Sequence, residues 1–335
     1  MSRPDLEQLV DDLARPGAYP HPAGDLEVHR THISVVFLAG DYAYKVKKPI
    51  ELGFVDYSTL ERRRHFCREE VRLNRRLAPD VYLGVAAVVR RDGELRVLSG
   101  GGADEAEVVE WAVRMRRLPA DRTLKTRLER DEVAPEELEQ LAAHLADFHG
   151  EARRDEEVAR YGRFEVVAGN ARDNIAAARE QVDRTIHPDV ADRLAERTEA
   201  TLDRHRRLIE DRAERGVPCD THGDLRLDHV YFLPGRDRPV VVDCIEFNPA
   251  FRFADPVSDM AFLAMDLEQA GRRDLSARFS DAYLRAAGDE EGRRLLDHYV
   301  AYRAAVRGKV QGIKAYEDDV PEEEREEAAE TAVGH

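Results

Sequence analysis

Ionisable side chains gather in one stretch of the chain, between His222 and Asp243. The stretch reads T-H-G-D-L-R-L-D-H-V-Y-F and closes with V-V-V-D-C-I-E-F, so that Asp224, Asp228 and His229 lie between those two residues. Carboxylates and imidazoles of this kind accept protons from hydroxyl groups and ligate divalent cations. The grouping therefore predicts a catalytic or metal-binding site.

Two short apolar runs, at 230–233 and 239–242, would position these side chains. They flank the residues P-G-R-D-R at 234–238, and apolar runs separated by Pro and Gly are typical of a β-hairpin. Because a hairpin returns the chain to its starting point, we expect Asp224 and His229 to face Asp243 across one small space.

The motif H-G-D-L-R-L-D-H-V-Y-F with V-V-V-D-C-I-E-F resembles the catalytic and metal loops of aminoglycoside phosphotransferase-like kinases, and D-P-V-S-D-M-A resembles the helix start that follows them. The resemblance covers most of the chain. It implies an α+β, two-lobed protein-kinase-like fold, with a small antiparallel sheet in the N-lobe and a mostly helical C-lobe. It also implies transfer of the γ-phosphoryl group of ATP to a hydroxyl of a small molecule. The implied catalytic residues are Asp224, as the base, and His222, and Asp243 is the implied Mg²⁺ ligand.

One position departs from the family pattern. Such kinases usually carry Asn, a second metal ligand, five residues after the catalytic Asp, and here that residue is His229. A neutral imidazole ligates divalent ions but suits Zn²⁺ or Mn²⁺ better than Mg²⁺. His229 is therefore either a metal ligand, with Mn²⁺ as an alternative ion, or a packing residue.

Two other functions compete with an active kinase. His229 and the lack of a glycine-rich phosphate loop are compatible with a pseudokinase-like nucleotide-binding or regulatory protein that transfers no phosphate. A metallohydrolase is the third hypothesis, because H-x-D-x-x-x-D-H is similar to the H-x-H-x-D-H motif of metallo-β-lactamase-like enzymes, but its spacing and second ligand differ.

A strand predicted at 42–48 places Ala43, Lys45 and Lys47 on one face, because side chains alternate along a strand. The A-x-K pattern resembles the third kinase strand, where Ala packs on adenine and Lys binds phosphates. The resemblance thus assigns ATP contacts to Ala43 and Lys45. The alternative is that both lysines line a solvated edge.

A helix predicted at 58–78 opens with a capping box, Ser58-x-x-Glu61. Glu70 falls on its apolar stripe, and a carboxylate on such a face needs a partner. We expect that partner to be Lys45, as in the lysine–glutamate pair of kinases, with Glu69 as the alternative to Glu70.

A further strand predicted at 108–115 resembles the one that enters the hinge between kinase lobes. By this likeness adenine would lie against backbone groups near Trp111 and Val113. The lone Trp111 could equally belong to the core.

The second part of the chain shows helical patterns, at 135–149, 171–215 and after Asp255-Pro256, an N-cap followed by Pro at the first helical position. In the kinase-like fold the residue matching Asp259 accepts backbone hydrogen bonds from the catalytic loop. We expect an N-terminal nucleotide-binding lobe at 1–112, a helical lobe at 113–316 with the catalytic hairpin at 220–246, and an acidic, flexible tail at 317–335.

Composition limits the partners. The 335 residues carry a formal net charge of −16, which argues against nucleic acids and anionic membranes as partners. Three cysteines without metal-type spacing and no secretory signal lead us to expect a cytoplasmic protein, and no apolar run is long enough for a membrane span. The hydroxyl acceptor and the oligomeric state are left open.

Overall fold

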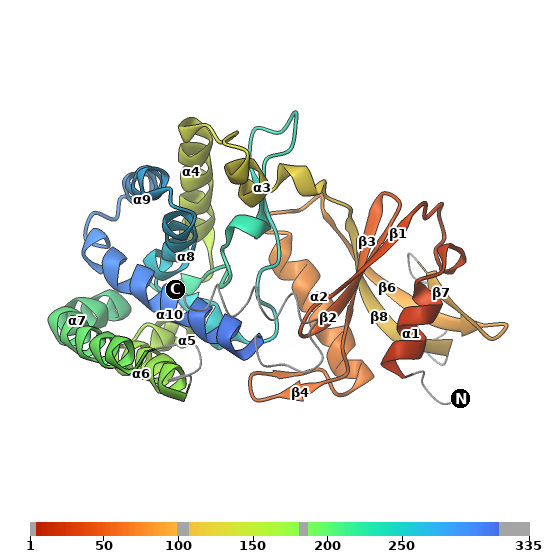
Figure 1. Ribbon diagram of the computed structural model, residues 1–335, viewed down its shortest axis with the longest axis horizontal. Coiled ribbons are helices and arrows are strands. Elements are labelled where there is room, and N and C mark those ends of the chain that lie inside the picture. Colours follow the sequence, from red (N-terminus) through yellow and green to blue (C-terminus); the bar gives the residue numbers. More distant parts are fainter. Residues whose placement is uncertain (1–4, 99–106, 181–186, 315–335) are drawn as a thin grey trace. The chain divides into compact units, whose positions relative to one another are not determined.

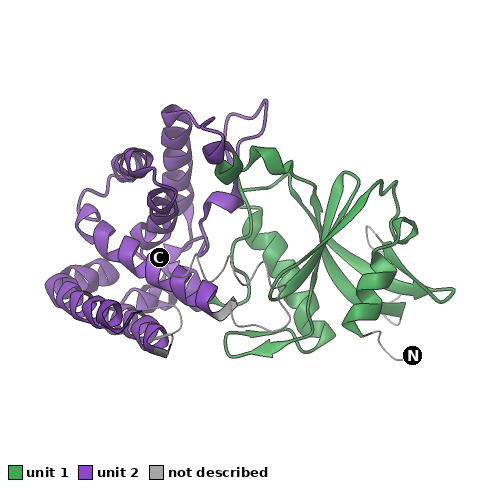
Figure 2. Cartoon of the chain, in the orientation of Figure 1, with its two compact units in different colours: residues 1–126, 240–249 green, residues 127–239, 250–335 purple. Residues whose placement is uncertain are grey.

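A computed structural model describes residues 5–98, 107–180 and 187–314 and divides the chain into two compact units (Figure 2). The first unit consists of Met1–Thr126 and Val240–Pro249, and the second of Arg127–Pro239 and Ala250–His335. The first unit extends past residue 112, because the following residues still hydrogen-bond inside its sheet, and the lobe boundary expected there stays a prediction. The expected tail at 317–335 lies outside the described residues.

The first unit is built on a six-stranded antiparallel sheet with the strand order β1-β2-β3-β8-β6-β7 (Figure 1). Its strands are β1 (Leu26–Arg30), β2 (Ser34–Ala39), β3 (Tyr42–Lys47), β6 (Tyr82–Arg91), β7 (Glu94–Leu98) and β8 (Val108–Arg116). A separate two-stranded sheet consists of β4 (Glu51–Leu52) and β5 (Val55–Asp56). Gly40, in the turn between β2 and β3, has a φ of 57°, a conformation that favours glycine.

Each face of the sheet is covered by one helix. Helix α1 (Leu6–Leu13) packs Leu9 and Leu13 into an apolar cluster with Phe37, Tyr44 and Val46. Tyr44 and Val46 belong to β3, and side chains alternate along a strand. The residues next to them on β3 therefore point to the opposite face of the sheet, which packs on α2 (Leu60–Asn74). The lysines of β3 therefore point toward α2.

Helix α2 begins one residue later than the capping-box pattern predicts. Its N-cap is Thr59, whose hydroxyl accepts a hydrogen bond from the backbone N of Arg62 at 3.2 Å. Ser58 instead donates from Oγ to Asp56 Oδ1 at 2.6 Å, so it closes the loop before the helix. The prediction of Ser58 as the cap is wrong because that carboxylate competes for its hydroxyl.

The second unit is mostly helical, as the charge-rich pattern predicts. Its helices are α3 (Leu124–Glu129), which spans the boundary between the units, α4 (Pro135–Glu151), α5 (Glu156–Tyr161), α6 (Phe164–Glu180), α7 (Pro188–Glu214), α8 (Pro256–Gln269), α9 (Arg273–Ala287) and α10 (Arg293–Lys314). Strands β9 (Cys219–Asp220) and β12 (Phe253–Ala254) pair antiparallel. Strands β10 (Val230–Tyr231) and β11 (Val240–Val241) form at the two runs predicted as hairpin arms.

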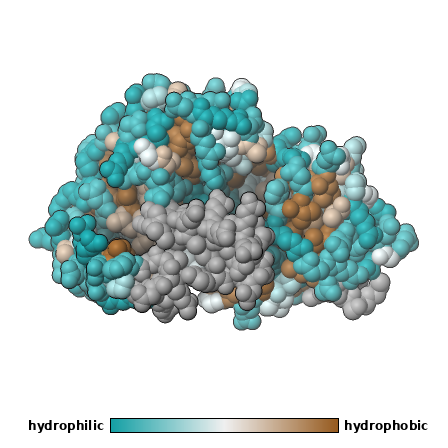
Figure 3. All heavy atoms as spheres, viewed as in Figure 1, coloured by the Kyte–Doolittle hydropathy of each residue, from teal (hydrophilic) through white to brown (hydrophobic). Residues whose placement is uncertain are grey.

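Within the second unit, helices α6 and α7 pack side by side, and α8 contacts both α9 and α10 (Figure 1). Hydrophilic residues cover most of the face drawn in Figure 3, and apolar residues form smaller groups on it. None of the helices in the described ranges combines the length and apolar character that crossing a bilayer requires.

Helix α8 is fixed at its start by a buried arginine. The predicted N-cap Asp255 accepts a hydrogen bond from Val257 N at 3.0 Å, and Pro256 is the first helical residue. Arg212 of α7, 1% exposed, donates to both oxygens of Asp255, at 2.6 and 2.9 Å, and to Asp289 at 2.7 Å. A planar guanidinium suits such paired carboxylates, so this contact fixes the helix that carries Asp259.

Burial lowers the pKa of His298 and His205, two neighbouring histidines of the second unit. Burial, and then the charge of His205 on α7, lower the pKa of His298 on α10 from 6.5 to about 4. Burial also lowers the pKa of His205. Above pH 6.5 both folded and unfolded chains keep His298 neutral, whereas between pH 6.5 and 4 only the unfolded chain binds the proton. Stability is therefore lost as the pH falls through this window.

We expect His298→Met to remove part of this acid sensitivity. A pKa difference of this size corresponds to about 3 kcal/mol of unfolding free energy at pH 4. Urea unfolding of wild type and variant from pH 7.5 to 4.5 measures it, with the exposed His29→Met as the control. Parallel stability curves for wild type and His298→Met would contradict the assignment.

Candidate active site

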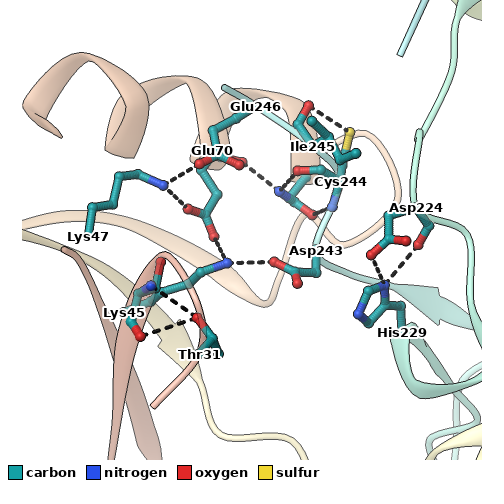
Figure 4. Close-up of polar contacts among 12 residues, drawn as sticks. Thr31, Lys45, Lys47, Glu70, Asp224, His229, Asp243, Cys244, Ile245 and Glu246 are labelled. Carbon is teal, nitrogen blue, oxygen red and sulfur yellow. Dashed lines mark hydrogen bonds and ion pairs between the residues drawn. The ribbon is translucent and has the colours of Figure 1, made fainter. Parts of the chain in front are cut away.

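The predicted ion pair between β3 and α2 is present in the first unit. Lys45 Nζ lies 3.0 Å from Glu70 Oε1 and 2.5 Å from Asp243 Oδ1 (Figure 4). The Glu70 side chain is fully buried, that of Lys45 is 13% exposed, and that of Asp243 is 44% exposed. The lysine therefore joins a buried carboxylate to an accessible one, and the alternative of a solvated edge is wrong.

The alternative partner Glu69 points elsewhere. Its carboxylate pairs with Arg72, with an Nη2–Oε2 distance of 2.7 Å, on an exposed part of α2. Helical spacing alone placed Glu69 and Glu70 close to the same stripe. Only the packing of α2 on the sheet distinguishes the two glutamates.

Sequence reasoning missed the second lysine of β3 and a further glutamate. Lys47 Nζ bonds Glu70 Oε2 at 2.7 Å and also bonds Glu246, and both the Lys47 and Glu246 side chains are buried. The available signals were the shared face of Lys45 and Lys47 and the acidic residue in D-C-I-E, three positions after Asp243. We call Lys45, Lys47, Glu70, Asp243 and Glu246 the lysine–carboxylate cluster.

Burial and charge act against each other in this cluster. Burial disfavours the ammonium form of Lys45, but Asp243 and Glu70 outweigh it and raise the pKa of Lys45 well above its ordinary value. Burial would raise the pKa of Glu70, but Lys45 and Lys47 outweigh it and lower that pKa. Lys45 and Glu70 therefore both favour their charged forms, as buried ion pairs with good geometry allow.

The backbone at Asp243 adopts an uncommon conformation. Its φ is 66°, in the left-handed region that non-glycine residues seldom occupy. Contacts on both sides hold it there: Asp243 N donates to the Tyr82 hydroxyl at 3.1 Å, and Cys244 N donates to Asn74 Oδ1 at 2.9 Å. Backbone strain of this kind persists where the surrounding structure fixes it, and it is common at functional sites.

The charges of the cluster fit a bound cation. Two ammonium groups face three carboxylates, so these five side chains carry a formal net charge of −1, and Asp243 is the most exposed of the three carboxylates. Among the described residues, no three His, Cys, Asp or Glu side chains form a metal cage by themselves. A Mg²⁺ ion is commonly held by one or two carboxylates, with water and phosphate oxygens as its remaining ligands.

The adenine contacts expected at Trp111 and Val113 stay a prediction. Both residues lie inside β8, where Val113 is registered with Lys45 on β3 and Val85 on β6. Trp111 N donates to the Glu110 carboxylate at 2.9 Å, so its backbone is engaged as well. The Trp111 indole packs in an apolar cluster under the Arg64 guanidinium, as the core alternative predicted. Ala43 is buried on the same face as Lys45, and its adenine contact also stays a prediction.

In the second unit, Asp259 braces the loop that carries Asp224. Asp259 Oδ2 accepts from His222 N at 3.0 Å, and Oδ1 accepts from Gly223 N at 2.8 Å, as the kinase-like pattern predicted. Gly223 has a φ of 88°, which a residue with a side chain would adopt only under strain. The turn thus directs two amides at one carboxylate and orients the start of the catalytic loop.

His149 of α4 completes the brace. Its Nε2 lies 3.0 Å from Asp259 Oδ2 and its Nδ1 lies 2.7 Å from the Tyr283 hydroxyl, with all three groups buried. Burial alone would raise the pKa of Asp259, but the hydrogen bond and charge of His149 outweigh it and lower that pKa. The sequence pattern gave no sign that His149 is a partner of Asp259.

His222 braces the loop that carries Asp224. Its side chain is completely buried, and its Nδ1 accepts a hydrogen bond from Asp224 N at 3.3 Å. The predicted catalytic role of His222 stays a prediction. Its neighbour Asp224 keeps a 28% exposed side chain.

The ring of His229 is tied to the same loop. His229 ends a single 3-10 turn, Leu227–His229, and its Nδ1 lies 2.8 Å from the backbone oxygen of Asp224. Because a carbonyl only accepts hydrogen bonds, Nδ1 carries the proton here, and a metal ion would be ligated through Nε2. Figure 4 shows the ring directed at Asp224. Asp224 and His229 belong to the second unit and Asp243 to the first, so their predicted convergence stays a prediction.

An antiparallel sheet unit with a lysine–glutamate pair and a helical unit with a braced acidic loop define an α+β, two-lobed protein-kinase-like fold. The crystal structure of a choline/ethanolamine kinase family protein from Mesorhizobium loti is similar, with a TM-score of 0.52 and 13% sequence identity. The match covers 97% of this chain and 92% of that one. At this identity the likeness concerns the fold alone.

The family follows from the sequence match. The model of the phosphotransferase enzyme family matches residues 58–299, and the chain belongs to this family. Uncharacterized proteins of Mycobacterium tuberculosis and Mycobacterium bovis are 35% identical over 318 residues. The match covers 94% of this chain, which spans 60% of the length of those relatives.

The brace at Asp259 leads to a prediction about the loop. Asp259→Asn removes the charge and one acceptor from a buried network, which should lower the unfolding free energy by about 3 kcal/mol and accelerate amide exchange at 222–224. Denaturant unfolding and hydrogen-exchange mass spectrometry measure both effects. Asp147→Asn is the control, because its exposed ion pair with Arg238 should contribute less than about 1 kcal/mol. Equal losses in both variants would contradict the brace.

Proposed function

We propose that this protein is an ATP-dependent phosphotransferase that moves the γ-phosphoryl group to a hydroxyl of a small molecule. The observation that carries the proposal is the contact of Lys45 with both Glu70 and Asp243, in a chain that belongs to the phosphotransferase enzyme family. Phosphoryl transfer depends mainly on positioning and charge neutralisation, and these three groups can supply both.

Lys45 is proposed to bind the ATP phosphates. Its ammonium group stays charged because the surrounding carboxylates raise its pKa against the effect of burial. Glu70 holds the lysine from the buried side, which leaves the accessible side of the ammonium for an anion. This arrangement limits the motion of a long side chain and so lowers the entropy cost of phosphate binding.

Asp243 is proposed to hold the metal ion, with His229 as the second ligand through Nε2. When bound, Mg²⁺ or Mn²⁺ neutralises negative charge on the phosphates. The exposed, strained Asp243 and the net negative charge of its cluster suit this role. An imidazole ligand would increase the preference for Mn²⁺.

Asp224 is proposed as the catalytic base. Its carboxylate accepts the proton of the acceptor hydroxyl while the hydroxyl oxygen forms a bond to the γ-phosphorus. The bond from that phosphorus to the bridging oxygen breaks, and ADP leaves. Asp259 and His222 act through the loop, because they fix the backbone on which Asp224 is carried.

The competing proposal is nucleotide binding without transfer. His229 is the residue that favours it, since its ring takes the place of the usual Asn and bonds the backbone of Asp224 through Nδ1. Turnover of ATP with Mg²⁺ or Mn²⁺, measured with sugars, amino sugars and amino alcohols as acceptors, separates the two. Metal-dependent ADP formation that requires an acceptor supports the kinase, and nucleotide binding without turnover supports the alternative.

Substitution of the two aspartates should separate binding from chemistry. Asp243→Asn should weaken metal-dependent ATP binding at least roughly tenfold, whereas Asp224→Asn should leave binding nearly intact and lower kcat by roughly 10²–10⁴-fold. Calorimetry and steady-state kinetics measure these effects. Asp25→Asn, an exposed carboxylate of the first unit, is the control. Unchanged affinity in Asp243→Asn would move the metal site elsewhere.

His229 should control the metal preference. If Nε2 ligates the ion, activity falls at acidic pH because a protonated ring cannot bind metal, and His229→Asn shifts the preference from Mn²⁺ toward Mg²⁺. Turnover against pH with each metal measures both effects in both proteins. Identical Mg²⁺ and Mn²⁺ profiles for wild type and variant would contradict the ligand role.

A further inference from the structure

Lys47 and Glu246 extend the site into the interior of the first unit. Lys47 Nζ contacts Glu70, Glu246 and, at 3.4 Å, the Tyr57 hydroxyl, which itself donates to Glu246 Oε1 at 2.5 Å. Figure 4 shows Lys45 and Lys47 both directed at Glu70, with Glu246 beyond it. Glu70 is therefore shared by two lysines, one near the exposed edge of the cluster and one completely buried.

Lys47 cannot reach a nucleotide. Its side chain has no exposed surface, and although burial disfavours its charge, Glu246 and Glu70 outweigh this and raise its pKa. It is a permanent buried cation that contacts these two glutamates and the Tyr57 hydroxyl. Any effect of Lys47 on nucleotide or metal must therefore pass through the groups that it contacts.

The charge distribution indicates how Glu70 and Glu246 would behave without Lys47. Glu70 and Glu246 would share a single remaining ammonium, that of Lys45, which also serves the exposed Asp243. Charges attract more strongly in a buried environment than beside water. Two buried glutamates would consequently draw Lys45 inward and away from Asp243.

We propose that Lys47 and Glu246 form a positioning pair that keeps Lys45 on Asp243 and at the phosphate site. Lys47 neutralises the inner side of Glu70, so that Lys45 remains available at the exposed edge. Glu246, three residues after Asp243, ties the metal-binding segment through Lys47 to Glu70 of α2. This proposal rests on the proposed function, in which Lys45 binds phosphate and Asp243 binds the metal ion.

A charge-balanced set of variants tests the pair. Lys47→Met keeps the length of the stem and makes the net charge of the cluster more negative, from −1 to −2. Glu246→Gln is isosteric and makes the cluster neutral. The double variant returns the cluster to −1. Arg63→Met, Glu110→Gln and their combination are the controls, because Arg63 and Glu110 form another buried ion pair between α2 and β8, at 2.7 Å.

The first readout is the position of Lys45 in crystal structures without nucleotide. The distance between Lys45 Nζ and Asp243 Oδ1 is 2.5 Å in the wild type. In Lys47→Met we expect this distance to increase beyond that of an ion pair, and in the double variant we expect the wild-type distance. Lys45 still bound to Asp243 in Lys47→Met overturns the proposal. Because no nucleotide is involved, this result does not depend on whether the protein is a kinase.

The second readout is the affinity for ATP with Mn²⁺, measured by calorimetry. We expect each single variant to bind roughly tenfold more weakly and the double variant to recover to within roughly threefold of wild type. The control pair should lower the melting temperature without changing affinity. Additive losses in the double variant overturn the proposal.

If Lys47→Met does not fold, the ATP affinities of Glu246→Gln and the double variant still test the proposal. Only if Lys47 and Glu246 are coupled does the double variant bind ATP more tightly than Glu246→Gln. If the wild type binds no nucleotide, the proposed function is refuted. If Lys45 nevertheless moves in Lys47→Met as expected, the role of Lys47 and Glu246 in holding Lys45 on Asp243 is still supported.

Discussion

Burial of Glu70 between two lysine ammonium groups is the interaction on which the proposed nucleotide site depends. A carboxylate without exposed surface on α2 is costly unless it is paired, and the sheet supplies Lys45 and Lys47 from one face of β3. Once Glu70 is satisfied, the position of Lys45 and its contact with Asp243 follow from the geometry of strand and helix. The buried Glu70 and Lys47 therefore fix the positions of Lys45 and Asp243 at the exposed edge of the cluster.

The second unit solves a similar problem in a different way. Asp259 is also a buried carboxylate, but it is satisfied by the backbone amides of His222 and Gly223 and by the ring of His149. Asp259 therefore orients a loop, whereas Glu70 orients the side chain of Lys45. In both units the groups assigned to chemistry, Asp224 and Asp243, are the partly exposed ones next to a rigid buried network. Such support suits groups that must hold their positions while reacting.

Several elements were predictable because their signals are local. Alternation along β3 and the N-cap Asp255 depend on residues a few positions apart, and these features formed as expected. The start of α2 was mispredicted because two groups compete for one hydroxyl. Asp56 engages Ser58, so the cap moves to Thr59.

The sequence by itself determined the kind of fold, the acidic loop and the lysine–glutamate pair, because motif spacing and side-chain periodicity are properties of short segments. Only the tertiary structure decided that Lys47 is buried, that Glu246 is its partner and that His149 supports Asp259. Lys47 and Glu246 lie 199 residues apart, and His149 and Asp259 lie 110 apart. A buried charge takes whichever partner the packing brings within reach, and no local pattern encodes that choice.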